Sequence, residues 1–247
     1  MAARRVYRIT GTDRETFLQN LVTNDVGRLK DGLVWTALLS PQGKYLADFF
    51  LVPDGEAILL DVDADLGPGL AQRLGMYRLR ADARIEETDI AVARGTGDAP
   101  DGAFADPRHP ELGWRAYDGR AGEEADWEAV RIRAGVPESG VDLIPNDSYP
   151  LETGFERFHG VDFRKGCYVG QEVTARMKHK TDLRKGLARV SLAGNARPGA
   201  AIMSDDGREA GVLRSVAGDR GLAYLRFDRT GGSLTADGAA VEVLDQI

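Results

Sequence analysis

The pattern of the chain changes once, near residues 180–185, and this change limits the fold more than any other feature. Upstream, strand-like runs alternate with helix-like runs; beyond Gly186, short apolar runs are separated only by turns rich in glycine, aspartate and proline. Closely spaced short strands with such turns are typical of a small antiparallel barrel. The sequence therefore predicts an α+β region followed by a C-terminal antiparallel β-barrel.

The upstream pattern predicts strands and helices in two layers. A strand at 6–9 leads into a helix that Thr12 would cap, with Glu15 completing a capping box. Turn signals separate further strands at 33–39, 45–52 and 57–62, and helices are expected at 66–77 and 123–134. Strands and helices of this kind favour α+β lobes of a ferredoxin-like type.

The composition limits the class and the compartment. A chain of 247 residues suggests two or three small domains, and 43% hydrophobic with 29% charged residues is ordinary for a globular protein. No apolar run reaches the length of a membrane span, and the first residues lack the apolar stretch of a secretory signal. One cysteine excludes an internal disulfide and fits a reducing compartment, so we expect a cytoplasmic location.

The same residue counts limit metal binding. An iron–sulfur cluster usually takes four protein ligands, mostly thiolates, whereas this chain has one cysteine and three histidines. The histidines also lack the paired spacing of a zinc site. We therefore expect no permanently bound metal.

The charge is negative overall but uneven. A net charge of −7 argues against binding nucleic acid through bulk electrostatics. Between residues 164 and 189, however, basic side chains outnumber Glu172 and Asp182. This stretch is either a solvated face or a positive field for an anionic ligand. Its basic residues are Arg164, Lys165, Arg176, Lys178, Lys180, Arg184, Lys185 and Arg189.

The single cysteine, Cys167, lies in the run Lys-Gly-Cys-Tyr-Val-Gly-Gln-Glu at residues 165–172. The apolar spacing that follows predicts a short amphipathic helix starting near Tyr168 or Val169, with Cys167 at its N-terminus. The helix dipole and Lys165 would then favour the thiolate, while Glu172 and Arg176 would form an i,i+4 pair. The alternative is that a lone cysteine is a small buried apolar residue. The flanking glycines favour an accessible loop.

This run carries a family resemblance. The motif K-G-C-Y-x-G-Q-E, followed by Arg176, resembles the signature of YgfZ-type folate-binding proteins, which are relatives of the glycine-cleavage T-protein and are linked to iron–sulfur cluster maintenance. The run F-L-Q-x-x-x-T-N-D-V at residues 17–26 and the stretch at 144–152 resemble two further segments of that family.

The resemblance implies a clover-leaf arrangement around a central pocket for tetrahydrofolate or a derivative. Residues 1–180 would form a discontinuous folate-binding region with about 30–90 as an inserted lobe, and 181–247 the barrel. It assigns the pterin-binding acid to Glu152, which without the resemblance reads as an exposed surface acid, and the functional thiol to Cys167. Further folate contacts would come from Leu151, Asn24 and Arg176. Support for the cysteine motif would come from Lys165, Gly166, Tyr168, Gly170, Gln171 and Glu172.

One departure from the T-protein bears on activity. That enzyme has adjacent aspartates where this chain has Ala47 and Asp48, which argues against aminomethyl transfer. The favoured hypothesis is a folate-dependent accessory factor that assembles or repairs iron–sulfur proteins by contact with carrier or client proteins. The alternatives are a folate-dependent transferase of the aminomethyltransferase class and a factor affecting tRNA modification, by direct tRNA binding or indirectly.

Overall fold

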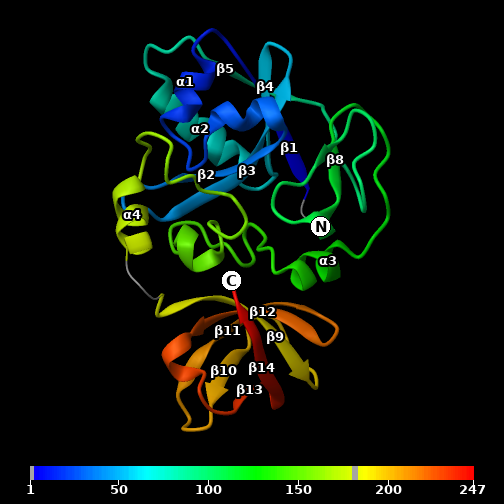
Figure 1. Cartoon of the computed structure of the whole chain (residues 1–247), viewed down its shortest axis with the longest axis vertical. Coiled ribbons are helices and arrows are strands. Elements are labelled where there is room, and N and C mark those ends of the chain that lie inside the picture. Colours follow the sequence, from blue (N-terminus) through cyan, green and yellow to red (C-terminus); the bar gives the residue numbers. More distant parts are fainter. Residues whose placement is uncertain (1–2, 180–182) are drawn as a thin grey trace.

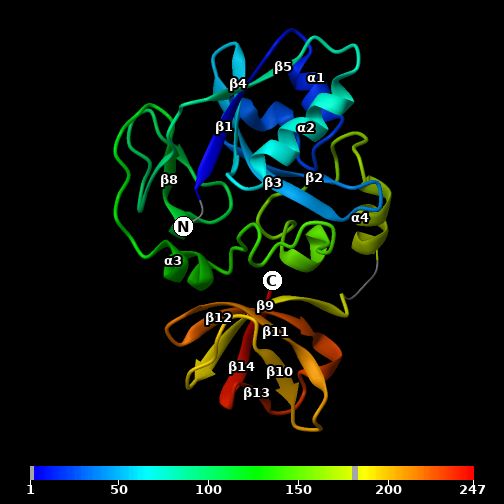
Figure 2. The same ribbon diagram turned by 180° about the vertical axis from the view of Figure 1, so that it is seen from behind.

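The computed structural model of the chain describes residues 3–179 and 183–247 (Figure 1). A sheet flanked by helices lies at one end of the molecule, a barrel lies at the other, and irregular segments with short helices lie between them, as both views show (Figures 1 and 2). No helix among the described residues is long and apolar enough to cross a membrane.

The first sheet has five antiparallel strands in the order β2-β3-β4-β1-β5. Strand β1 is an interior strand, because it pairs with β4 on one side and β5 on the other. The strand bounds are β1 Arg4–Thr10, β2 Val34–Leu39, β3 Tyr45–Asp54, β4 Ala57–Asp63 and β5 Arg84–Thr88.

The two faces of this sheet bury different partners, because successive side chains of a strand point to opposite faces. One face packs on the helices α1 (Arg14–Gln19) and α2 (Gly67–Arg78), and Ala47 belongs to this core. Phe50 and Trp35 face the other way, against residues from 112 to 168. Asp48 lies on this second face, so the sheet directs Asp48 toward the middle of the molecule and Ala47 away from it.

The middle of the chain contains a small sheet and several short helices. Strands β6, β8 and β7 pair in that order, and helix α3 follows. Their bounds are β6 Ala93–Gly95, β7 Phe104–Ala105, β8 Trp114–Ala116, α3 Trp127–Ala134 and α4 Gln171–His179, and the 3-10 helices are η1 Val26–Asp31, η2 Pro110–Leu112, η3 Pro150–Thr153 and η4 Phe227–Arg229.

The barrel is closed, with strand order β10-β11-β12-β9-β14-β13, and its interior is an apolar core of its own. Closure leaves no unpaired strand edge. The strands are β9 Lys185–Ala193, β10 Ala201–Ser204, β11 Glu209–Ala217, β12 Arg220–Arg226, β13 Leu234–Ala236 and β14 Ala239–Gln246.

Several local expectations change in the structure. Asp13, not Thr12, precedes α1, and Thr12 hydrogen-bonds to Asp82 instead of capping the helix. Helix α3 begins at Trp127, four residues later than expected. The division into domains stays a prediction, since strands from 34–88 share their sheet with β1, and the expected boundary at residues 180–181 lies outside the described residues.

Candidate functional site

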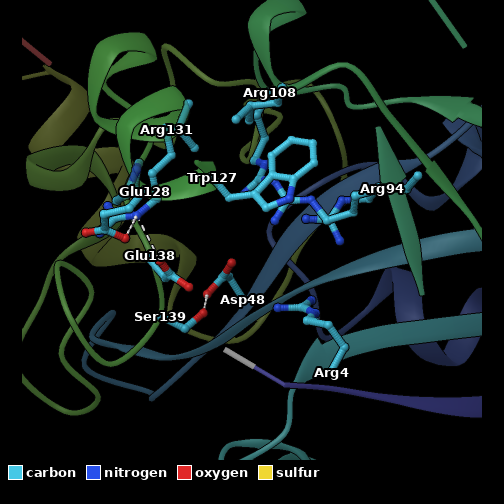
Figure 3. Close-up of a pocket in the computed structure, with 13 residues that line it drawn as sticks. Arg4, Asp48, Arg94, Arg108, Trp127, Glu128, Arg131, Glu138 and Ser139 are labelled. Carbon is cyan, nitrogen blue, oxygen red and sulfur yellow. Dashed lines mark hydrogen bonds and ion pairs between the residues drawn. The ribbon is translucent and has the colours of Figure 1, made fainter. Parts of the chain in front are cut away.

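A cavity lies where the second face of the first sheet meets β8, α3 and the segment that follows α3 (Figure 3). Its walls carry arginines, acids and one indole, drawn from distant parts of the chain. The lining residues used below are Arg4, Asp48, Arg94, Arg108, Arg115, Trp127, Glu128, Arg131, Glu138 and Ser139.

Asp48 is a buried carboxylate in this wall, with 4% of its surface exposed. Trp35 Nε1 donates to Asp48 Oδ2 at 2.8 Å, and Tyr45 Oη donates to Oδ1 at 2.7 Å. Ser139 Oγ also donates to Oδ1, at 2.5 Å. Burial and the adjacent Asp48 raise the pKa of Tyr45 well above its usual value, so the phenol remains a donor. Three donors therefore hold this carboxylate in place.

Arg115 joins two buried acids behind the cavity. Its guanidinium lies 3.0 Å from Asp61 and 3.2 Å from Asp106. Arg4 also pairs with Asp61, and Arg108 pairs with Asp106. These guanidiniums lower the pKa of Asp61 and of Asp106 despite the opposing effect of burial. The acids are therefore charged, and the network depends on Arg115.

Arg131 forms a second network that reaches the barrel. It pairs with Glu128, Glu138 and Asp142, at 2.5, 2.8 and 2.6 Å. Ser215, on strand β11, donates to Asp142 and accepts from Arg131. Residues 138–142 are thus tied both to α3 and to the barrel, and the same segment brings Ser139 to Asp48.

Arg94 borders the cavity over the ring of Trp127, 4.3 Å from its centroid. Burial, together with the charges of Arg115 and Arg108, lowers its pKa to about 9. An anion entering the cavity would favour the charged form of this guanidinium.

The room in the cavity is about 40 Å³. A cavity needs about 10–15 Å³ of such room to hold one water molecule, so this one has room for a few waters. A larger ligand therefore requires side chains in the wall to move.

Cys167 lies on the surface, in the loop before α4. The helix begins at Gln171, four residues after the cysteine, so the expected start at Tyr168 or Val169 is wrong. Gly170 has φ +81°, a value outside the helical range, and a Cβ there would lie 2.5 Å from the carbonyl oxygen of Ser40. A Cβ at Gly43 would in turn lie 2.7 Å from the Cβ of Val173. This tight packing against the β2–β3 turn sets the start of the helix.

Lys165 points into the protein, not toward the thiol. Its Nζ donates to the carbonyl oxygen of Gln19 at 2.6 Å and to that of Val22, near the C-terminus of α1. It also lies 5.0 Å from the ring centroid of Tyr168. Burial lowers its pKa to about 8, against the charges of Asp25 and Asp162. Lys165 therefore anchors the cysteine loop.

The rest of the cysteine motif divides into exposed and buried residues. Gly166 is exposed, whereas Tyr168 is buried, and burial raises the pKa of its phenol to about 12. Gln171 opens α4, and Glu172 and Arg176 are exposed on it. No ion pair joins Glu172 to Arg176 among the described residues, so the expected pair does not form.

Glu152 and Leu151 are buried in η3, beside the barrel rather than in the cavity wall. The Glu152 carboxylate accepts a hydrogen bond from Tyr224 Oη and lies 3.6 Å from Lys185 Nζ. The backbone of Glu152 also packs against Gly186, since a Cβ at Gly186 would lie 2.8 Å from the carbonyl oxygen of Glu152. In this structure, Glu152 joins the α+β region to the barrel.

Asn24 is 3% exposed, and its side chain serves the backbone around it. The amide donates to the carbonyl oxygens of Trp35 and His159 at 2.8 and 2.6 Å, and its oxygen accepts from the amide of Asp25. The residue borders a separate surface pocket near Trp35. Among the described residues, neither Glu152 nor Arg176 lines this pocket with Asn24.

The basic stretch is largely paired or buried. Lys178 pairs with Glu156, and Arg189 with Asp245, while Lys165 is buried. Lys180 and Asp182 lie outside the described residues. Arg164, Arg176 and Arg184 are exposed and take part in no ion pair among the described residues.

Sequence reasoning missed the arginines of the cavity. Arg4 and Arg115 meet Asp61 across 57 and 54 positions, a relation that no local pattern displays. One signal was available, because Arg115 stands between apolar residues in the run Trp-Arg-Ala at 114–116. A charge inside an apolar strand indicates a buried partner.

No group of three or more histidine, cysteine, aspartate or glutamate side chains that could hold a metal ion occurs within residues 3–179 and 183–247.

The fold and the C-terminal barrel both have counterparts among known proteins. The chain shares its fold with glycine cleavage system aminomethyltransferase T from Bartonella henselae, with a TM-score of 0.78 at 15% identity over 98% of this chain and 83% of that one. Residues 184–246 match the family described as CAF17, C-terminal beta-barrel domain. These matches confirm the predicted fold class.

Curated relatives decide the family. The mouse iron-sulfur cluster assembly factor IBA57 is 30% identical, over 94% of this chain and 78% of its own length. The chain belongs to the IBA57 family. The human IBA57 is 29% identical over 96% of this chain and 80% of its own length. The Mycosarcoma maydis homologue is 33% identical over 79% of this chain, which spans 57% of that protein.

These relatives correct two expectations. The resemblance to the YgfZ type identified a related family, whereas the relatives carry the name IBA57. The expected cytoplasmic location is contradicted, because the Mycosarcoma maydis, human and mouse proteins are all named as mitochondrial. A single cysteine fits any reducing compartment, so the cysteine count does not distinguish the cytoplasm from another reducing compartment.

Proposed function

We propose that this protein assists the assembly or repair of iron–sulfur proteins, with Cys167 as the thiol that meets a cluster or its carrier. The supporting observation is the exposed position of this single thiol in a chain of the IBA57 family. The backbone of the loop that carries the thiol is held at two points. Lys165 anchors the loop to α1, and Gly170 packs the loop against the β2–β3 turn.

The cluster is cargo in this proposal. One thiolate supplies one of about four ligands, so the others come from a carrier or client protein or from small thiols. An exposed loop suits this task, since a buried thiol could not reach a cluster held by another protein.

A reduced folate is the proposed occupant of the central cavity. It combines a flat heteroaromatic ring with carboxylates, and the wall offers matching groups. Trp127 provides an aromatic face and Arg94 a cation for carboxylates. Glu138 would accept from ring N–H groups in place of its present partner Arg131. When bound, such a cofactor supplies one-carbon or reducing chemistry. Because the room is about 40 Å³, entry requires side chains such as Arg94 to move from their present positions.

The two other hypotheses receive less support. An aminomethyl transferase would need an acid free to act, whereas Asp48 already accepts from Trp35, Tyr45 and Ser139. A second aspartate at position 47 would lie on the opposite face of the sheet, within the α1 and α2 core. A tRNA-binding role has a smaller positive surface than the sequence suggests, because Lys178 and Arg189 are paired with acids.

Replacing the thiol tests the assembly role. In cells that lack the endogenous protein, Cys167→Ala should reduce the activity of iron–sulfur enzymes to the level of the deletion strain. Its folding and abundance should match the wild type, because Cys167 is exposed. Full complementation by Cys167→Ala would contradict the proposal.

Titration with tetrahydrofolate tests the cavity separately. Arg94→Met should weaken binding by about ten- to a hundredfold, as expected for loss of a charge-assisted contact. Glu152→Gln is the informative contrast. If Glu152→Gln binds like the wild type while Arg94→Met binds weakly, the folate lies in the cavity. If Glu152→Gln alone loses binding, the folate lies beside η3, as the family resemblance implied. Wild-type affinity in both variants would exclude both the cavity and the site beside η3 as the folate site.

A further inference from the structure

The C-terminal end of α2 exposes a group of apolar side chains that no function above uses. Met76 is 62% exposed, Tyr77 40% and Leu79 89%. Among the described residues, the other large hydrophobic side chains of this exposure are Val141 and Leu244, which belong to the segment after α3 and to strand β14. Met76, Tyr77 and Leu79, with the arginines that flank them, are called the α2 patch below.

The α2 patch is positive on a negative protein. Arg73, Arg78 and Arg80 are exposed, and residues 67–81 contain no acid, although the chain carries a net charge of −7. None of these three arginines takes part in an ion pair within the part of the chain that the structure describes. Exposed apolar side chains rimmed by one sign of charge are typical of a protein interaction site.

Leu79 adds a conformational cost. It has φ +43°, in the range that favours glycine, and its side chain is almost fully in water. A leucine here is costly for both the backbone and the solvation of the free protein. A partner that covers the side chain would offset part of that cost.

The α2 patch and the cysteine loop lie on the same flank. The end of α2 and the loop before α4 are both at the left of Figure 1 and at the right of Figure 2. The interior is consistent with this, because Lys165 joins the cysteine loop to α1, which packs beside α2 in one core. A partner that covers this flank would contact both the cysteine loop and the α2 patch.

We propose that the α2 patch is the docking surface for an acidic protein that carries the cluster to or from Cys167. The inference rests on the proposed function and adds the partner's chemistry, namely an acidic rim around an apolar contact. Charge complementarity selects this occupant. A symmetric second copy, by contrast, would place arginine against arginine.

The test replaces Tyr77 with the photo-cross-linking residue p-benzoylphenylalanine in cells that naturally make the protein, and identifies every cross-linked protein by mass spectrometry. Leu244 of the barrel, replaced in the same way, is the matched control. We expect cross-links from position 77 to acidic proteins that hold iron–sulfur clusters. The double variant Arg78→Glu with Arg80→Glu should lower their yield about tenfold, whereas Arg220→Glu with Arg226→Glu in the barrel should leave it unchanged.

The other occupants are outcomes that would overturn the proposal. These are cross-links mainly to a second copy, binding of the purified protein to phosphatidylglycerol vesicles that needs Arg78 and Arg80, or a yield no higher than from position 244. Leu79→Gly checks the fold, because it should relieve the backbone and weaken docking without loss of stability. Cys167→Ala separates the two proposals: if it keeps cellular enzyme activity, the proposed function fails, whereas normal activity of the double arginine variant overturns only the docking surface.

Discussion

The central cavity and the cysteine loop are built in opposite ways. In the cavity, acids such as Asp48 and Asp61 are buried and held by three groups each, from strands and loops far apart in sequence. In the loop, Cys167 is exposed, and Lys165 fixes the backbone from beneath. A cavity of this kind suits a small ligand that must be kept from water, whereas the loop suits contact with another macromolecule.

The largest effect should come from breaking the cavity's charge network. Arg115→Met leaves Asp61 and Asp106 with fewer cations, and loss of one partner from a buried ionic network costs about 3–5 kcal/mol. Urea unfolding should show this loss, whereas Arg220→Met in the barrel should change stability by less than about 0.5 kcal/mol. An Arg115→Met protein as stable as the wild type would mean that the network does not hold the cavity.

A smaller effect concerns the anchor of the loop. The folded pKa of Lys165 is about 8, below its ordinary value of 10.5. Between these values the unfolded chain binds more protons than the folded one, so stability should rise with pH across this window. We expect a rise of about 1–2 kcal/mol, because each pKa unit corresponds to about 1.4 kcal/mol and Lys165 keeps part of its hydration.

The check is unfolding of the wild type and of Lys165→Met at pH 7.5 and pH 10. The difference in stability between the two proteins should change with pH in the stated direction. A constant difference would show that Lys165 has the same pKa in the folded and unfolded chain.

Ser139→Ala removes one of the donors to Asp48. The carboxylate keeps Trp35 and Tyr45, so the cost should be about 1 kcal/mol in thermal unfolding. A loss above about 3 kcal/mol would mean that the segment carrying Ser139 depends on this bond, and the cavity wall would then be less rigid than the comparison implies.

The smallest effect should come from the thiol. Cys167→Ala should alter the unfolding free energy by less than about 0.5 kcal/mol, because the side chain is exposed. Iodoacetamide should modify Cys167 in the native protein within about tenfold of the rate for the unfolded chain. Protection by a much larger factor would show that the loop is closed, and the contrast with the cavity would disappear.

The sequence predicted the parts that depend on neighbouring residues. Turn chemistry and alternation indicated the barrel, and glycines beside Cys167 indicated an accessible loop. The start of α4 was missed because the contact of Gly170 with the β2–β3 turn links residues about 130 positions apart. The cavity was missed for the same reason, since Arg4 gives no sign that it will meet Asp61. Glu152 carries no sign of Tyr224, its partner 72 positions later.

The interior position of β1 in its sheet affects how the chain folds during synthesis. This strand leaves the ribosome before its partners, which are residues 58–63 and 84–88. Until those residues emerge, Val6, Tyr7 and Ile9 have no sheet to join, and both edges of the strand are open. Pairings over such separations form slowly and leave a nascent chain prone to association. A chaperone that binds β1, or a mutation within β1, should therefore change the yield of folded protein.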